Sequence, residues 1–460
     1  FNSAASGITS WYTNTGLANQ IKESSQVLSP CFDLRGLEKP MVKLNIWSAP
    51  ENGRDGAVLQ YSIDGGKTWL NSAIVGAANE GINWYDPVNV SSKPLGQSAG
   101  WSGSNPQEGW KSARHNLDII KDSSNVRFRI VYANDAINIS PFNGFAFDDF
   151  WIGERQQMVL TEAFTNVDNQ FDAVNLFLKD FEKQKQKDIV SIHYHTSIPA
   201  DDPFYNYYSA GTMSRGFYYG AANAPYVYSN GKNPSSISTS ETIKEYIRVV
   251  DEKTLVDPIL NITQITGNVG NIRVDLTANR DIDGENLVLY CALVKDSIIS
   301  NGGEYFYNVL RKFYPSPSGV PLSTANWLSG QTRNQDISIS FDNSAEIIDA
   351  KLVLFVQNTS TNAIYQTAVY SDLQTVLSIK PIDISKNVDL FPNPASDNVI
   401  VQCAERIDRI AIFDITGRII DEYTPGQEQY SLPLQGYKNG VYLVKGFTKN
   451  GQFVKKLVKH

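Results

Sequence analysis

Short apolar runs separated by turn-forming residues fill most of this 460-residue chain, and they limit it mainly to β folds. In residues 1–155 the runs alternate with clusters of Gly, Asn and Ser, which is the pattern of strands joined by tight turns. These runs are Met41–Trp47, Ala57–Tyr61, Val126–Ala133 and Phe145–Ile152. The sequence therefore predicts a β-sandwich over residues 1–155.

Further β regions follow later in the chain. Apolar runs predict a second β-sandwich over residues 258–378. Residues 379–388, which include Pro381, are expected to form a linker, and residues 389–460 predict a small β unit. A chain of this length has room for several such units, each large enough to bury a core of its own.

Residues 156–257 show a different pattern and predict a mixed α/β domain. A strand at Val159–Phe164 is followed by four apolar residues at steps of 3, 4 and 3, which form the stripe of an amphipathic helix. They are Phe171, Val174, Leu178 and Phe181. A buried strand is then expected at Ile189–His195.

The second half of this domain carries helix-start signals. Asp202 followed by Pro203 predicts the N-cap and first turn of one helix. Ser238 and Glu241 have the spacing of a capping box and predict the start of the last helix. With a short hairpin between these helices, the predicted order of elements is βαβαββα.

Charge and hydropathy exclude two classes of protein. The formal charge is −8, from 40 Lys and Arg against 48 Asp and Glu, so a nucleic-acid binder with a broad cationic face is not expected. No apolar run reaches the roughly 18 residues of a transmembrane helix. The first residue is Phe1 rather than Met, and we expect a chain that was processed or truncated at its front.

The cysteines and histidines restrict the chemistry further. Cys31, Cys291 and Cys403 lie more than 100 residues apart, which excludes a CxxC pair or a zinc ribbon, and we expect three buried thiols. His193 and His195 share one face of a predicted strand, but no further ligands can be placed beside them. The sequence predicts no metal site and no cofactor from these residues.

Two adjacent carboxylates are the remaining candidates for ion binding. Asp148 and Asp149 lie on a predicted strand, so their side chains should point to opposite faces and not act as a pair. One of them could join Asp55 around a structural calcium ion. We expect instead a solvated acid or one that braces a hairpin.

The most specific motifs lie in residues 389–460. They are Phe391-Pro392-Asn393-Pro394-Ala395, Ile412-Phe413-Asp414-Ile415-Thr416-Gly417-Arg418, Asn439-Gly440-Val441-Tyr442 and Lys455-Lys456-Leu457. In order and spacing they resemble the C-terminal sorting domain of type IX secretion cargo. The candidate sorting-signal residues are Pro392, Asn393, Pro394, Asp414, Gly417, Arg418, Gly440, Tyr442, Lys455 and Lys456.

That resemblance implies an immunoglobulin-like module that directs export through the outer membrane of Bacteroidetes-type bacteria. The implied partners are an outer-membrane shuttle protein, a translocon and a sortase that cleaves the domain. The implied location is the cell surface or the extracellular space. Residues 438–460 also carry six lysines and no acidic side chain, which either steer docking or protect an edge strand.

The middle of the chain resembles a second family. Val159–Thr165, Ile189–His195, Asp202-Pro203-Phe204 and Ala224-Pro225 are similar to motifs of the thioredoxin-like domain of Omp28-type outer-membrane lipoproteins. Where that family's pattern has CxxC, this chain has Asn166–Asp172, so thiol-disulfide exchange is not expected. Pro225 matches the family's cis-proline position. If cis, it would border a peptide groove, for which the candidate residues are Pro225, Tyr226, His193 and His195.

The front of the chain resembles a third family. Ser62–Trp69 matches a single Asp-box turn, and with Ser29–Leu34, Gly56–Tyr61 and Gly144–Phe150 it resembles a MAM-like jelly roll, which implies an accessory module for adhesion or carbohydrate contact. Seven of the eight tryptophans lie in this region. We expect them in the sandwich core rather than on a sugar-binding face.

These features together favour a non-enzymatic binding or adhesion protein, mainly β and multidomain, with a surface glycan or protein as ligand. One alternative is an accessory subunit that stays with an outer-membrane complex. Another is a glycan or peptide hydrolase that uses His193 or His195 as a base, although no nucleophile motif accompanies them. A cluster of tyrosines around residues 205–228 is typical of a recognition surface and equally of helix packing.

Overall fold

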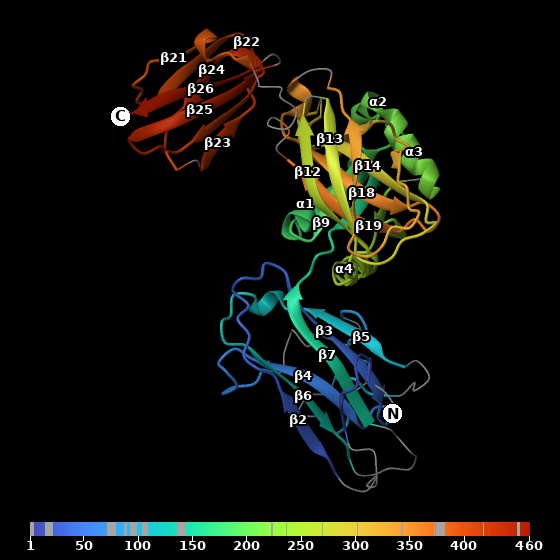
Figure 1. Ribbon diagram of the computed structural model, residues 1–460. Helices are drawn as coiled ribbons and strands as arrows, with labels where there is room; N and C mark the ends of the chain where they lie inside the picture. The colour runs from blue at the N-terminus through green and yellow to red at the C-terminus, as the bar shows by residue number, and fades with distance from the viewer. Residues whose placement is uncertain are drawn as a thin grey trace. The chain divides into compact units, whose positions relative to one another are not determined.

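The computed structural model describes the chain with short gaps (Figure 1). The residues outside the description are 1–3, 14–21, 71–79, 87–89, 93–98, 104–108, 136–143, 222–223, 236, 269, 301, 342–343, 372, 374–381, 417 and 449–450. The chain forms two compact units. Unit 1 contains residues 1–163, 176–191 and 225–259, and unit 2 contains residues 164–175, 192–224 and 260–460.

The front of unit 1 consists of two antiparallel sheets around one core. The first sheet has the order β1-β7-β3-β5, with strands Trp11–Tyr12, Gly144–Glu154, Pro40–Ala49 and Lys111–Asn116. The second has the order β2-β6-β4, with strands Ser24–Leu28, Arg127–Ala133 and Gly56–Ser62. Alternating apolar residues of both sheets meet in the core, as in other sandwiches.

The tryptophans of this region are only partly in that core. Trp47, Trp84 and Trp101 are buried, as expected, and Trp101 packs edge-on against Trp84. In contrast, Trp11 is 60% and Trp151 is 40% exposed. The prediction that this set forms the sandwich core is therefore wrong for these two rings.

A sheet of nine strands runs through the middle of the chain. Its order is β11-β10-β8-β9-β15-β14-β18-β19, and β16 pairs with β14. The strands are Lys232–Ser235, Tyr226–Ser229, Val159–Thr165, Ile189–His195, Tyr305–Tyr314, Leu287–Ile299, Ala350–Asn358, Ile364–Tyr370 and Val320–Pro321. Val309 on β15 pairs in parallel with His193 on β9, so the sheet continues past residue 258, where we expected a separate sandwich to begin.

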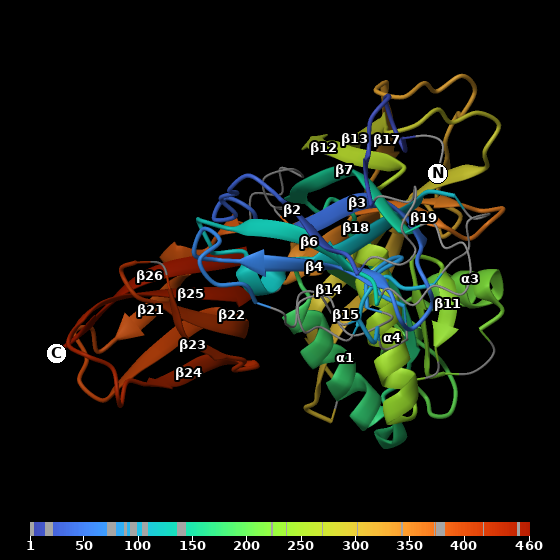
Figure 2. The ribbon, with the colours of Figure 1, turned by 90° about the horizontal axis from the view of Figure 1, so that it is seen from below.

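Four helices accompany the described part of this sheet and confirm the predicted order βαβαββα, with its second helix in two pieces. They are α1 Asp172–Gln184, α2 Pro203–Tyr207, α3 Ser209–Tyr219 and α4 Ser240–Thr254. Figure 2 shows α1 beside α4, and Phe181 on α1 packs against Tyr246 on α4. The capping box of α4 uses Thr239 and Thr242 instead of the expected Ser238 and Glu241.

Two further sheets complete unit 2. The first has the order β12-β13-β17, with strands Leu260–Asn268, Asn271–Ala278 and Thr332–Ser338. The second has the order β20-β26-β25-β22-β21, and β23 and β24 also pair with β22. Its strands are Ile382–Asp383, Gly451–Lys459, Gly440–Thr448, Asn398–Phe413, Val388–Phe391, Ile419–Tyr423 and Gln427–Pro433. Among the described residues, no helix is both long and apolar enough to cross a membrane.

Candidate functional site

The Pro392–Pro394 motif lies along the outer edge of the last strand, β26. Cis peptide bonds precede both prolines, and Asn393 lies between them. The Asn393 Nδ2 atom donates to the carbonyl of Lys456 at 2.6 Å, and its Oδ1 atom accepts from the amide of Val458 at 2.9 Å. The side-chain amide therefore pairs with β26 as a peptide group of a neighbouring strand would.

Further main-chain groups along the same edge are also paired. β20 pairs in parallel with Gly451 and Gln452 at the start of β26, and the Ser385 hydroxyl accepts from the amide of Val454. The amide of Ala395 donates to the carbonyl of Val458 near the end of the strand. An exposed strand edge is a template for another strand, and here segment 382–395 occupies it.

The other candidate sorting residues occupy a turn and the neighbouring strands. The Asp414 carboxylate accepts from the hydroxyl of Thr416 and from the amides of Arg418 and Thr416, which together lower its pKa, and it pairs with the Arg418 guanidinium at 3.2 Å. Gly417, in the same turn, lies outside the described residues. Gly440 begins β25, and the buried Tyr442 donates to the carbonyl of Lys438 at 2.9 Å.

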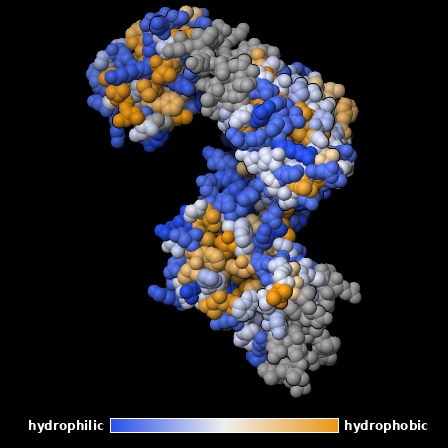
Figure 3. Space-filling model, in the orientation of Figure 1, coloured by the Kyte–Doolittle hydropathy of each residue, from blue (hydrophilic) through white to orange (hydrophobic). Residues whose placement is uncertain are grey.

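Apolar side chains gather on the outer face of this sheet. Figure 3 shows them on the part of the domain where Figure 1 labels β23 and β25. They include Ile419, Val441, Leu443 and Val454, which are 38–50% exposed. Lys456, opposite Leu443 in the register, is exposed on the same face, whereas Lys455 is half-buried. The face therefore mixes apolar contact area with positive charge.

The segment Asn166–Asp172, which the sequence resemblance aligned with a CxxC motif, is held by polar contacts. The buried Asn166 donates from Nδ2 to the carbonyls of Thr196 and Ala200 at 2.7 and 2.9 Å. Its Oδ1 atom accepts from the amide of Asp168, whose carboxylate caps the following 3-10 turn. No thiol lies in this fully described segment, so it has no group for disulfide exchange.

The two strand histidines are inside the protein. His193 and His195 are 4% and 2% exposed. The His195 Nδ1 atom lies 2.7 Å from the carboxylate of Asp202, which also caps α2 through the amides of Phe204 and Tyr205. Burial lowers the pKa of His195, although the contact with Asp202 raises it. This arrangement joins β9 to α2 and offers a substrate no direct access to either imidazole.

The peptide groove expected from Pro225, Tyr226, His193 and His195 is not formed as predicted, because both histidines are buried. Tyr226 is half-buried at the start of β10, and the Ala224–Pro225 bond is not among the cis bonds of the described residues. Those bonds precede Pro199, Pro315, Pro392 and Pro394.

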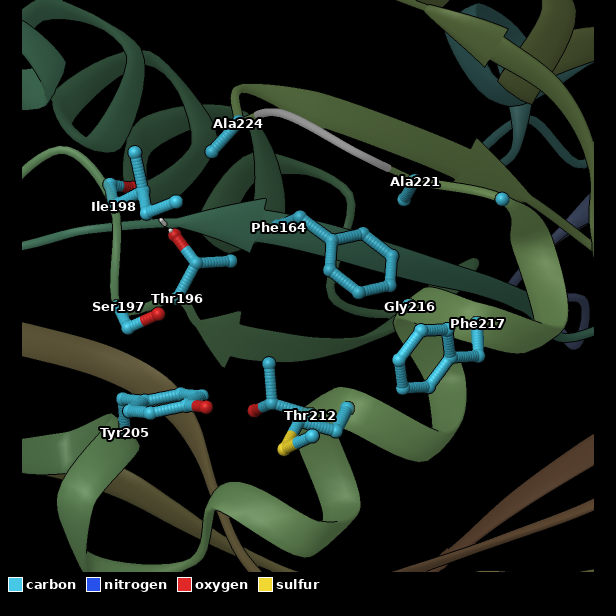
Figure 4. A pocket seen from close by; sticks show the side chains of 12 residues that line it. Phe164, Thr196, Ser197, Ile198, Tyr205, Thr212, Gly216, Phe217, Ala221 and Ala224 are labelled. Atoms are coloured by element: carbon cyan, nitrogen blue, oxygen red, sulfur yellow. Dashed lines mark hydrogen bonds between the residues drawn. The ribbon is translucent and has the colours of Figure 1, made fainter.

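A cavity of about 340 Å³ lies nearby in unit 2 (Figure 4). It is lined by the end of β8, the segment after β9, and helices α2 and α3. The lining residues are Phe164, Thr196, Ser197, Ile198, Tyr205, Thr212, Met213, Gly216, Phe217, Gly220, Ala221 and Ala224. Ile198, Met213 and Phe217 are 66%, 46% and 79% exposed.

Sequence reasoning found only part of this cavity. It singled out Tyr205 among the tyrosines but did not name Met213 and Phe217, because apolar helix residues show the same pattern whether they face a core or a cavity. The sequence did contain one signal for an exposed apolar surface on this helix: α3 has no face made only of polar residues. Of the other tyrosines, Tyr207 is 49% exposed under the Arg311 guanidinium, and Tyr228 is buried.

Two expectations for polar groups elsewhere were wrong. Asp148 and Asp149 do act on one partner: the Asp148 carboxylate accepts from the amide of Ser6, and the Asp149 carboxylate from its hydroxyl at 2.6 Å. Asp149 has φ of +51°, and the strand register shifts here, so the expected alternation of faces fails. Cys31 is exposed, not buried. Among the described residues, no group of three or more His, Cys, Asp or Glu could hold a metal ion.

Comparison with known proteins identifies the C-terminal part of the chain. Residues 389–460 match the family described as the secretion system C-terminal sorting domain. A search of curated proteins found no match.

Solved structures give only remote likenesses. HBP35 of Porphyromonas gingivalis is 14% identical with a TM-score of 0.39, over 66% of this chain and 99% of that chain. PorZ, a surface component of the type IX secretion system of Porphyromonas gingivalis, is 13% identical with a TM-score of 0.16, over 41% of this chain and 29% of that chain. Neither likeness assigns a function to the body of the chain. The C-terminal sorting domain marks this protein as type IX secretion cargo, exported across the outer membrane to the cell surface or the extracellular space.

Proposed function

We propose that the exported protein acts by binding a ligand and not by catalysis, and that the cavity beside α3 is its binding site. The observation that most supports a binding function is a preformed, mainly apolar cavity close to the segment Asn166–Asp172, which contains no thiol. Its rim exposes Ile198, Met213 and Phe217, and such apolar area at a concave site is typical of recognition.

We assign this part of the chain to a thioredoxin-like domain of Omp28 type. The strand order β11-β10-β8-β9 and the helices between these strands support that assignment. The two sheets of unit 1 are in turn consistent with a MAM-like jelly roll serving as an adhesion module. In this proposal Asn166 and Asp168 keep the former active-site loop folded through hydrogen bonds instead of supplying chemistry.

For the sorting domain, we propose that the secretion machinery reads side chains on the outer face of β25 and β26. The outer edge of β26 is already paired with segment 382–395, whereas Leu443 and Lys456 are exposed on the face. A shuttle protein and a sortase are the partners that we assign to this face.

The binding function can be tested in native cells with two exported variants. Met213→Lys together with Phe217→Lys places two charges at the rim of the cavity. We expect normal export but loss of the surface material that co-purifies with the full chain. Leu176→Lys, at an apolar side chain that is 57% exposed on α1, is the matched control and should change neither.

Three results would contradict the proposal. The first is equal recovery of surface material with the rim variant. The second is hydrolysis of glycans or peptides by the purified chain that a His193→Ala, His195→Ala variant loses. The third is purification only as a fixed part of an outer-membrane complex with residues 389–460 intact, which would favour an accessory subunit.

A further inference from the structure

The cavity beside α3 has a polar end made of three hydroxyl groups. Ser197, Tyr205 and Thr212 direct their hydroxyls toward the same side of the cavity in Figure 4. In the described part of the chain, none of these hydroxyls makes a hydrogen bond. Thr212 is 7% exposed as a residue, but its hydroxyl is not among the fully buried unpartnered atoms of the described residues, so it remains open to the cavity. Hydroxyl groups that face a cavity without a protein partner can donate to or accept from a polar group of a bound ligand.

The opposite end of the cavity is apolar. Figure 4 shows the rings of Phe164 and Phe217 along this side, with Ala221 beside them. Gly216 lies on the same wall, and a Cβ atom there would contact the Phe164 ring at 3.8 Å without a clash. The cavity therefore has one end for hydrogen bonding and one for an aromatic or branched aliphatic group.

The charge of the ligand is restricted by the lining. Of the described residues that line the cavity, none is an Asp, Glu, Lys, Arg or His. An ionised group placed there would lose hydration without gaining a charged partner. A neutral ligand carries no such cost.

The volume restricts the size of the ligand. A cavity of about 340 Å³ is at the lower end of the range of about 300–1,000 Å³ for small-molecule sites. At about 30 Å³ for each water-sized atom group, it accommodates on the order of ten non-hydrogen atoms.

We infer that this cavity binds a small neutral molecule with an aromatic or branched aliphatic body and a single hydroxyl or carbonyl group. The hydroxyls of Ser197, Tyr205 and Thr212 recognise the polar group, and Phe164 and Phe217 contact the body. The inference rests on the proposed binding function and narrows it to one class of ligand.

The test uses the purified full-length chain and p-cresol as the probe, with binding measured by calorimetry and ligand-observed NMR. Toluene, benzoate and benzylamine share its ring and differ in the polar group. We expect p-cresol to bind about three- to tenfold more tightly than toluene, the effect of one hydrogen bond. Benzoate and benzylamine should bind more weakly than toluene.

Three variants test whether p-cresol binds in this cavity. Gly216→Leu fills the space beside Phe164 and replaces a helical glycine, so it should abolish p-cresol binding while keeping or raising thermal stability. Ala210→Leu, at an exposed position on the same helix, is the matched control and should leave binding unchanged. Thr212→Val should reduce the preference for p-cresol over toluene without weakening toluene binding.

Equal binding of p-cresol and benzoate, or binding that survives Gly216→Leu, would overturn the inference. Tighter binding of an acetylated, amidated tyrosine tripeptide than of p-cresol would also overturn it, in favour of a polypeptide ligand. In each case, loss of surface material from the Met213→Lys, Phe217→Lys variant would leave the broader binding function standing.

Discussion

Arg215 on α3 is the residue whose substitution tests the packing of unit 2 most directly. Its side chain is 1% exposed. The guanidinium donates to Gln357 Oε1 at 2.9 Å and to the Tyr219 hydroxyl at 2.8 Å. It also lies over the rings of Tyr290 and Phe355, at 5.0 and 5.3 Å from their centres. Arg215 thus attaches α3 to strands β14 and β18.

Replacing Arg215 by Lys keeps the charge but loses the planar fork. At least one of the two hydrogen bonds is lost, each of which contributes about 1.5–3 kcal/mol when one partner is charged. Stacking on the two rings also weakens, and each such contact contributes about 0.5–2 kcal/mol. We expect the free energy of local opening of α3 to fall by about 3 kcal/mol, which corresponds to roughly a hundredfold.

Hydrogen exchange in residues 209–219 measures this opening directly. The amides of α3 should exchange roughly a hundredfold faster in Arg215→Lys. Arg273→Lys is the control, because Arg273 is exposed and pairs with Asp336 at 2.8 Å, and it should change exchange in β13 by less than about tenfold. An Arg215→Lys effect no larger than that of Arg273→Lys would refute the reasoning.

Three further predictions concern other parts of the chain. Asn393→Asp keeps the acceptor for the Val458 amide but loses the donor to the Lys456 carbonyl. The free energy of unfolding of the sorting domain, measured by thermal denaturation, should therefore fall by about 1 kcal/mol, and Asn393→Ala should lower it further. Since burial lowers the pKa of His195, the unfolded chain binds a proton near pH 6.5 that the folded chain does not. The free energy of unfolding should therefore fall as the pH drops below 6.5, by at most about 1.4 kcal/mol per pH unit. Urea titrations at several pH values measure this dependence, and His195→Gln should lack the part due to His195. Under native conditions a thiol reagent should modify the exposed Cys31, whereas Cys291, whose thiol pKa is raised by burial, should react only after unfolding, as mass spectrometry of labelled peptides would show.

Local patterns predicted the elements whose signals lie within a few residues. The apolar stripe of residues 171–181 became α1 with its 3-10 turn, and Asp202 caps α2 as the Asp-Pro step indicated. The capping box shifted by one residue because Thr239 and Thr242 satisfy each other's backbone amides, as Ser238 and Glu241 would have done for their own amides one residue earlier. Composition alone does not separate such adjacent alternatives.

The cavity could not be predicted, since it is a property of tertiary packing. Thr212 and Phe217 lie on α3, and they line a cavity only because β8 places Phe164, and the segment after β9 places Ser197, opposite them. An apolar helix residue has the same pattern whether it faces a core or an open cavity. Asp148 and Asp149 show the same limit, because a single positive φ cancels the alternation on which their predicted separation relied.

The sorting motif shows the difference between recognising a pattern and explaining it. Phe391-Pro392-Asn393-Pro394 was identifiable from sequence, yet its partners on β26 lie 63 and 65 residues further along the chain. Proline cannot donate to a strand, so Asn393 supplies both a donor and an acceptor through its side chain between two residues that lack backbone N–H groups. Beyond the two residues of β20, side-chain and loop groups therefore close this edge of the terminal strand. In the recognition proposed for this domain, the receptor discriminates cargo by side chains such as Leu443 and Lys456, because the amides of Val454 and Val458 on this edge are already paired.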